Sequence, residues 1–101
     1  MMNEKEERKE NIFKIAEEDL EEIIRIHEKK MNLFELKKMI KINHDLFQKD
    51  MSIDEEKKKK EKMLYENIEL SMKKEIEKLD AKIEELKINV DEALEIFDKS
   101  Q

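Results

Sequence analysis

The chain has 101 residues, half of them charged, and it contains no glycine, proline or cysteine. Because glycine and proline are the residues that most folds use for tight turns, their absence leaves helix as the main backbone conformation. The lack of cysteine excludes disulfides and thiolate metal sites, and the lack of glycine excludes phosphate-binding loops. A net charge of −6, with both signs mixed along the chain, does not favour nucleic-acid binding.

The first predicted helical arm covers about residues 4–50. Its first part has an apolar face at helical spacing, made of Ile12, Ala16, Leu20, Ile23, Ile24, His27 and Met31. Its second part has a separate 3,4,3,4 seam, made of Leu33, Leu36, Ile40, Asn43 and Phe47. The two patterns are out of phase near Asn32, where the helix either continues through a stutter or breaks. The absence of a glycine cap there favours continuity.

Asn43 is a polar residue at a core-type position of this arm, and we interpret it as a residue that specifies register. The connection that follows covers about residues 50–60. Ser52 and Glu55 fit a capping box at the start of the second arm, about 53–99. The sequence leaves open whether the run Lys57–Lys60 is helical or a loose connection.

The length of the connection decides which residues of the two arms meet. A tight turn would leave Leu46 and Phe47 facing charged residues. A longer connection would pair Phe47 with Leu64 and Phe13 with Phe97, at the expense of a segment with strong helical propensity.

The second arm has the most regular pattern, a seam of apolar residues spaced 4,3,4,3,4,3,4. It consists of Met72, Ile76, Leu79, Ile83, Leu86, Val90, Ala93 and Phe97. A parallel homodimer would set like charges against each other on the flanks of this seam, so antiparallel packing is favoured.

The predicted fold is all-α: a long antiparallel helical hairpin, or coiled coil, that forms one domain over residues 1–101. The alternative is a compact three- or four-helix bundle. Because one hairpin has a single seam with which to offset the entropy of ordering, we expect self-association into a helical bundle. The expected self-association seam is Met72, Ile76, Leu79, Ile83, Leu86, Val90 and Phe97.

No catalytic, cofactor-binding or metal site is predicted. Neither His27 nor His44 has a glutamate three residues before it, as a helical di-metal site would require. His27 falls on the apolar face, and His44 is expected to point to solvent. The run Lys57–Lys60 is bracketed by acids, so nucleic-acid binding is not expected there.

The expected function is that of a non-enzymatic protein–protein interaction module: a small adaptor, chaperone or regulator acting through helical apolar faces. Its partner is a protein of unspecified identity. In the tight-turn register five residues lack an apolar counterpart and form the expected partner site: Met39, Ile42, Leu46, Phe47 and Met51. The alternative is a small acidic inhibitor of a larger nucleic-acid-processing enzyme, for example from a phage or mobile element. No apolar run is long enough to cross a membrane, and the expected location is cytoplasmic.

Overall fold

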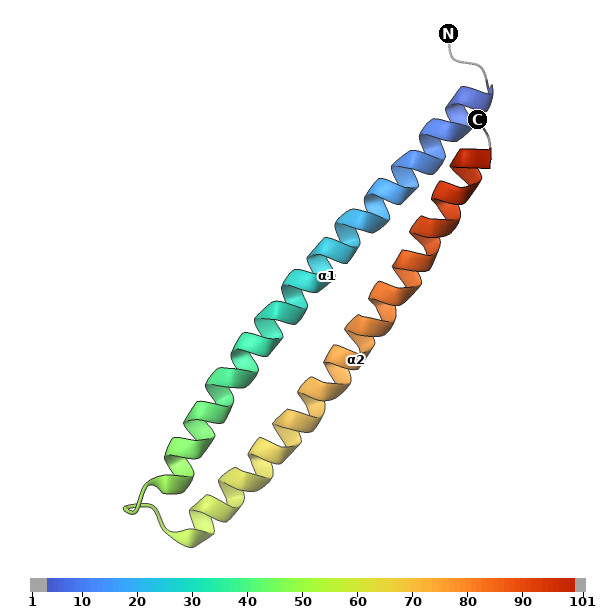
Figure 1. Cartoon of the computed structure of the whole chain (residues 1–101). Helices are drawn as coiled ribbons and strands as arrows, with labels where there is room; N and C mark the ends of the chain where they lie inside the picture. The colour runs from blue at the N-terminus through green and yellow to red at the C-terminus, as the bar shows by residue number, and fades with distance from the viewer. Residues whose placement is uncertain (1–3, 100–101) are drawn as a thin grey trace. The chain divides into compact units, whose positions relative to one another are not determined.

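The computed structural model describes residues 4–99, which form two long helices (Figure 1). Helix α1 covers Glu4–Lys49 and helix α2 covers Glu55–Lys99, with 46 and 45 residues. Residues 4–99 contain no strand. The predicted all-α antiparallel hairpin is therefore confirmed, and the compact bundle is not favoured.

Contacts divide the chain into two units, and both helices contribute to each. The terminal unit consists of Met1–Glu28 with Leu79–Gln101, and the turn unit is Lys29–Lys78. In the turn unit the last part of α1 and the first part of α2 are joined by the short connection. In the terminal unit the pairing is marked by the rings of Phe13 and Phe97, whose centroids lie 6.2 Å apart.

The inner face of helix α1 agrees only in part with the one that the sequence predicts. Its least exposed positions follow one heptad pattern: Lys9, Ile12, Ala16, Asp19, Ile23, Ile26, Lys30, Leu33, Lys37, Ile40, His44 and Phe47. Four of these positions from Ile12 onward are polar or charged: Asp19, Lys30, Lys37 and His44. They interrupt the apolar periodicity, so the pattern is not apparent from the sequence. Leu20, Ile24, His27, Met31 and Leu36, predicted to face inward, are exposed.

The observed pattern runs through the position where two out-of-phase faces were predicted. Helix α1 has no break near Asn32, which confirms the continuous helix. Asn43 is exposed and His44 takes the inner position beside it, so the register role of Asn43 and the solvent position of His44 were both wrong. Leu33, Ile40 and Phe47 of the predicted seam are inner residues, as expected, whereas the two positions between them shift by one residue, from Leu36 to Lys37 and from Asn43 to His44.

The five-residue connection is closed by side chains instead of glycine. The Ser52 backbone amide and hydroxyl donate to Asp50 Oδ1 at 2.9 and 2.6 Å, and the Ile53 amide donates to the Asp50 carbonyl at 3.3 Å. No residue among those described has a positive φ. An aspartate at the first position of such a turn suits these bonds.

The N-cap of α2 is Asp54, not Ser52 as the capping box predicts. Asp54 Oδ1 accepts from the Lys57 backbone amide at 2.8 Å, and the Asp54 carbonyl accepts from the Lys58 amide at 3.1 Å. Both residues are of a type that caps helices, but Ser52 is already bonded to Asp50. Consequently Lys57–Lys60 lie within the first turns of α2 and are helical.

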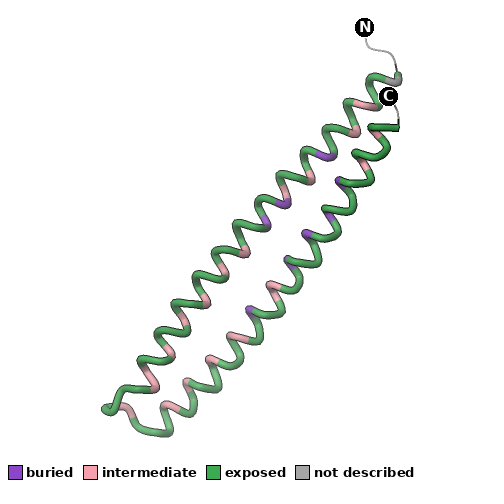
Figure 2. The backbone as a smooth tube through the Cα atoms, in the orientation of Figure 1, coloured by how far each residue is buried: buried purple, intermediate pink, exposed green. Residues whose placement is uncertain are grey.

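The buried residues gather in the terminal unit, on both of its helix segments (Figure 2). They are Ala16, Ile23, Ile26, Leu79, Ile83, Leu86 and Val90. In the turn unit only Met72 is buried among the hydrophobic residues. None of the described helices has an apolar stretch that could span a membrane.

Candidate functional site

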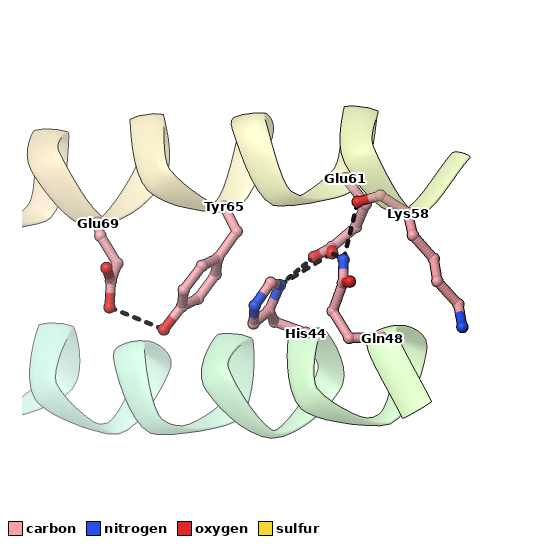
Figure 3. Close-up of polar contacts among 6 residues, drawn as sticks. All are labelled: His44, Gln48, Lys58, Glu61, Tyr65 and Glu69. Atoms are coloured by element: carbon pink, nitrogen blue, oxygen red, sulfur yellow. Dashed lines mark hydrogen bonds and ion pairs between the residues drawn. The ribbon is translucent and has the colours of Figure 1, made fainter. Parts of the chain in front are cut away.

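Polar side chains occupy the inner face of the turn unit, where the terminal unit has apolar ones (Figure 3). His44 from α1 lies between two residues of α2. Its Nδ1 is 2.7 and 2.8 Å from the two carboxylate oxygens of Glu61, and its ring stacks on Tyr65 with centroids 3.8 Å apart and planes at 6°. A carboxylate only accepts hydrogen bonds, so Nδ1 carries the hydrogen in this contact.

Gln48, one turn after His44, makes the second connection between the helices. Its Nε2 donates to Glu61 Oε2 at 2.6 Å and to the Lys58 carbonyl at 2.8 Å. Burial opposes the charged form of Glu61, but the hydrogen bonds from Gln48 and His44 outweigh it and lower the pKa of the carboxyl. Glu61 is therefore a charged acceptor bonded by two side chains of the opposite helix.

Tyr65 closes the cluster on the side away from the connection. Its hydroxyl donates to Glu69 Oε1 at 2.7 Å. This bond, with burial and the negative charge of Glu69, raises the pKa of Tyr65 to about 12. The phenol thus remains protonated at neutral pH and serves as a donor.

We call His44, Gln48, Glu61, Tyr65 and Glu69 the polar cluster. Its members hydrogen-bond or stack with one another, so it fixes how α1 meets α2 next to the connection. A satisfied polar network of this kind specifies a register more sharply than an apolar seam, which tolerates sliding. No group of three or more metal-binding side chains occurs among residues 4–99.

The seams predicted from the sequence do not include this cluster. Along α2 the inner positions Lys58, Glu61, Tyr65, Glu69 and Met72 are spaced 3,4,4,3, and only the last is a typical apolar seam residue. A search for apolar periodicity ends at Met72 and treats the preceding carboxylates as solvent-exposed. Two features of the sequence could have predicted the cluster. Tyr65 is an aromatic residue within a charged segment of α2, and His44 and Gln48 lie at i and i+4 on α1.

The residues of the expected partner site separate into two groups. Met39, Ile42 and Leu46 lie on the outside of α1 and are 62%, 59% and 64% exposed, and Met51 in the connection is 98% exposed. Phe47 is half-buried at an inner position of α1. The structure therefore leaves Met39, Ile42, Leu46 and Met51 on the surface and separates Phe47 from them.

The residues of the expected self-association seam lie inside the hairpin. Met72, Leu79, Ile83, Leu86 and Val90 are buried, and Ile76 and Phe97 are half-buried. Because α1 of the same chain covers them, a second copy would have to bind elsewhere. Helix α1 offers such surface, since ten of its large apolar residues are exposed: Phe13, Ile15, Leu20, Ile24, Met31, Phe34, Leu36, Met39, Ile42 and Leu46.

Comparison of the chain with protein-family models, with curated proteins and with solved structures finds no match.

Proposed function

We propose that the chain is a non-enzymatic protein-interaction module, a small adaptor, chaperone or regulator. Its turn unit binds an apolar helical face of a partner protein through the outside of α1. The observation that carries this proposal is the exposure of Met39, Ile42 and Leu46, which we call the outer patch.

The spacing of the outer patch supports a helical partner. Its residues follow one another at i, i+3 and i+7, so they lie along one side of α1. Anchors at this spacing are typical where an amphipathic helix packs against another helical surface. Met51, at the adjacent connection, extends the apolar surface, and methionine side chains adapt to partners of different shape.

The polar cluster supports the same proposal from inside the turn unit. Its hydrogen bonds hold α1 against α2 at His44, between Ile42 and Leu46 of the outer patch, and at Gln48, two residues beyond Leu46. The outer patch is thus presented on a helix that is fixed at this point. A surface that is ordered before binding loses less entropy when a partner docks.

A second candidate function is inhibition of a larger nucleic-acid-processing enzyme. The charge of the terminal unit favours it, because this unit carries 17 acidic against 8 basic residues. A dense acidic surface is complementary to the basic surface with which such an enzyme holds nucleic acid. Duplex DNA added to the captured complex would release a partner bound in this way, and would leave a partner on the outer patch in place.

The test is affinity capture with the immobilised protein, comparing the wild type with the double variant Ile42→Ala/Leu46→Ala. Removal of two anchors should weaken partner binding at least about tenfold, which corresponds to about 1.4 kcal/mol. Its melting temperature should stay close to that of the wild type, because both side chains are exposed. Ile88→Ala, which truncates an exposed isoleucine of α2, is the matched control and should bind as the wild type does.

Phe47→Ala separates partner binding from folding. Phe47 is half-buried, so its truncation should lower the free energy of unfolding by roughly 1–3 kcal/mol, less than for a fully buried phenylalanine. Partner binding per folded molecule should persist.

Equal capture by the wild type and the Ile42→Ala/Leu46→Ala variant would contradict the proposed partner site.

A further inference from the structure

Two phenylalanines of α1 are exposed, and their surroundings carry opposite charge. Phe13, in the terminal unit, is 49% exposed, and Phe34, in the turn unit, is 43% exposed. Each directly follows an inner residue, Ile12 and Leu33. They therefore occupy equivalent heptad positions, on the flank of the inner face.

Phe34 is surrounded by lysines. Its neighbours along α1 one and two turns away are His27, Lys30, Met31, Lys37, Lys38 and Lys41, with no acidic residue among them. The Lys30 Nζ lies 6.0 Å from the centroid of the Phe34 ring. Phe34 is thus an aromatic side chain flanked by lysines along α1, although Lys37 also lies near Glu66 and Glu69 of α2.

Phe13 lies beside a hollow with an acidic rim. The hollow has a volume of about 680 Å³ and is lined by the rings of Phe13 and Phe97 and by Glu6, Glu10 and Glu17, together with Lys9 and Lys14. It lies wholly within the terminal unit. Its aromatic floor suits an apolar ring, and its three carboxylates suit cations next to that ring.

We propose that two copies of this chain associate by inserting Phe34 of each copy into the Phe13–Phe97 hollow of the other. Both surfaces belong to every copy, so the contact can form reciprocally, as a two-fold symmetric dimer requires. This inference does not rest on the proposed partner site, because Phe34 lies on a different side of α1 from Met39 and Leu46.

Antiparallel α1 helices bring the two charge patterns together. With Phe34 opposite Phe13, three glutamates of one copy lie opposite three lysines of the other: Glu6 with Lys41, Glu10 with Lys37, and Glu17 with Lys30. Lys41 is exposed, whereas Lys30 and Lys37 are half-buried at inner positions, and the Lys30 side chain extends to the flank that holds Phe34. A parallel arrangement of the two α1 helices lacks these pairs of opposite charge, because it would place Phe34 against Phe34 and lysines against lysines. One like-charge pair, Lys9 with Lys38, remains in the antiparallel arrangement.

The charge of the two units favours the same pairing. The turn unit has 14 lysines and 11 acidic residues, a net charge of +3, and the terminal unit has a net charge of −9. An encounter between the turn unit of one copy and the terminal unit of another is therefore attractive, and encounters between terminal units are repulsive. The net charge of −6 for the whole chain is the sum of these two opposite values.

Sedimentation equilibrium of the whole chain tests the docking of Phe34. The wild type should form dimers at micromolar concentration and dissociate as sodium chloride is raised, because salt screens the glutamate–lysine pairs. Phe34→Ala should weaken dimerisation at least about tenfold. Leu46→Ala, which truncates an exposed side chain of the outer patch, should dimerise as the wild type does.

Charge reversal tests the register. The acidic variant is Lys37→Glu/Lys41→Glu, and the basic variant is Glu6→Lys/Glu10→Lys. Each alone sets like charges against each other and should be monomeric, whereas an equimolar mixture should form heterodimers, because both sets of opposite charges are then restored. Helical circular dichroism of each variant verifies that it remains folded.

A wild type that is monomeric at all concentrations would overturn the inference. So would dimers of wild-type affinity in Phe34→Ala, or a mixture of the two folded charge variants that does not associate. Loss of dimerisation with intact partner capture, or the reverse, distinguishes this contact from the proposed partner site.

Discussion

At the scale of single residues, His44 and Glu61 decide how the turn unit is built. Neither residue is apolar, yet both are inner positions, because each satisfies the other across the helix pair at 2.7 Å. Gln48 donates to the same carboxylate. Polar side chains can thus occupy inner positions of a helix pair, provided that they form hydrogen bonds with one another.

Glu61 makes the stability of the protein depend on pH at the acid end. Its pKa is lowered in the folded chain, so the unfolded chain takes up this proton first as pH falls. The stabilisation by Glu61 is complete above its ordinary value of about 4.5 and is lost as pH falls through the lower folded value. Asp50, whose pKa the Ser52 hydrogen bonds lower, acts in the same direction.

Glu61→Gln should therefore lower the melting temperature at pH 7 by several degrees and have much less effect at pH 3. Thermal unfolding followed by circular dichroism at both values measures this. The control is Glu77→Gln, which removes a carboxylate from an exposed position of α2. A difference between wild type and Glu61→Gln that is the same at both pH values would show that the charge of Glu61 is not what stabilises the cluster.

At the scale of the elements, the helix ends depend on two aspartates. Asp50 holds the connection through Ser52, and Asp54 caps α2. The three carboxylates at Asp54, Glu55 and Glu56 also place negative charge at the positive end of the helix dipole. A chain without glycine or proline can thus reverse direction with side-chain hydrogen bonds alone.

Asp54→Ala should cost about 1 kcal/mol of unfolding free energy, the usual value for loss of an N-cap. For a domain of this size, that lowers the melting temperature by about 4–8 °C. Ser52→Ala, the comparison, removes the exposed hydroxyl and its bond to Asp50 but keeps the bond from the Ser52 backbone amide, and it should cost less. If Ser52→Ala proved the more damaging of the two, the capping box expected from the sequence would be the real start of α2.

At the scale of the whole molecule, the two units differ in what lines their inner faces. The terminal unit buries seven hydrophobic residues, and the turn unit buries Met72 and relies on the polar cluster. Apolar burial excludes water from backbone hydrogen bonds more effectively than a half-buried polar seam does. The single domain over residues 1–101 stays a prediction, and within it we expect the turn unit to open more readily than the terminal unit.

Amide hydrogen exchange measures how readily each of the two units opens. Amides around Ile23–Ile26 and Ile83–Leu86 should exchange most slowly, and those of α1 and α2 next to the connection should exchange faster, with the helix ends fastest. Mass spectrometry of proteolytic peptides resolves these segments. A single exchange rate across both units would instead show one cooperative unfolding unit.

The helical class, the connection near residue 50 and the inner face of the second helix from Met72 onward could all be predicted from the sequence. The physical reason is local: helix propensity and the absence of glycine and proline act within a few residues. The regular spacing of apolar residues from Met72 to Phe97 leaves one face on which α2 can pack.

The sequence predicts the inner face of α1 only in part, and the rest depends on contacts with α2. Helix α1 has apolar residues on several sides, so local patterning permits more than one inner face. The choice depends on α2, where Glu61 and Tyr65 supply partners for His44 and Gln48. These partners are polar and distant in sequence from His44 and Gln48. The spacing of hydrophobic residues therefore cannot predict the contacts between them. The exposed positions of Phe13 and Phe34, and hence the surface proposed for a second copy, follow from that choice.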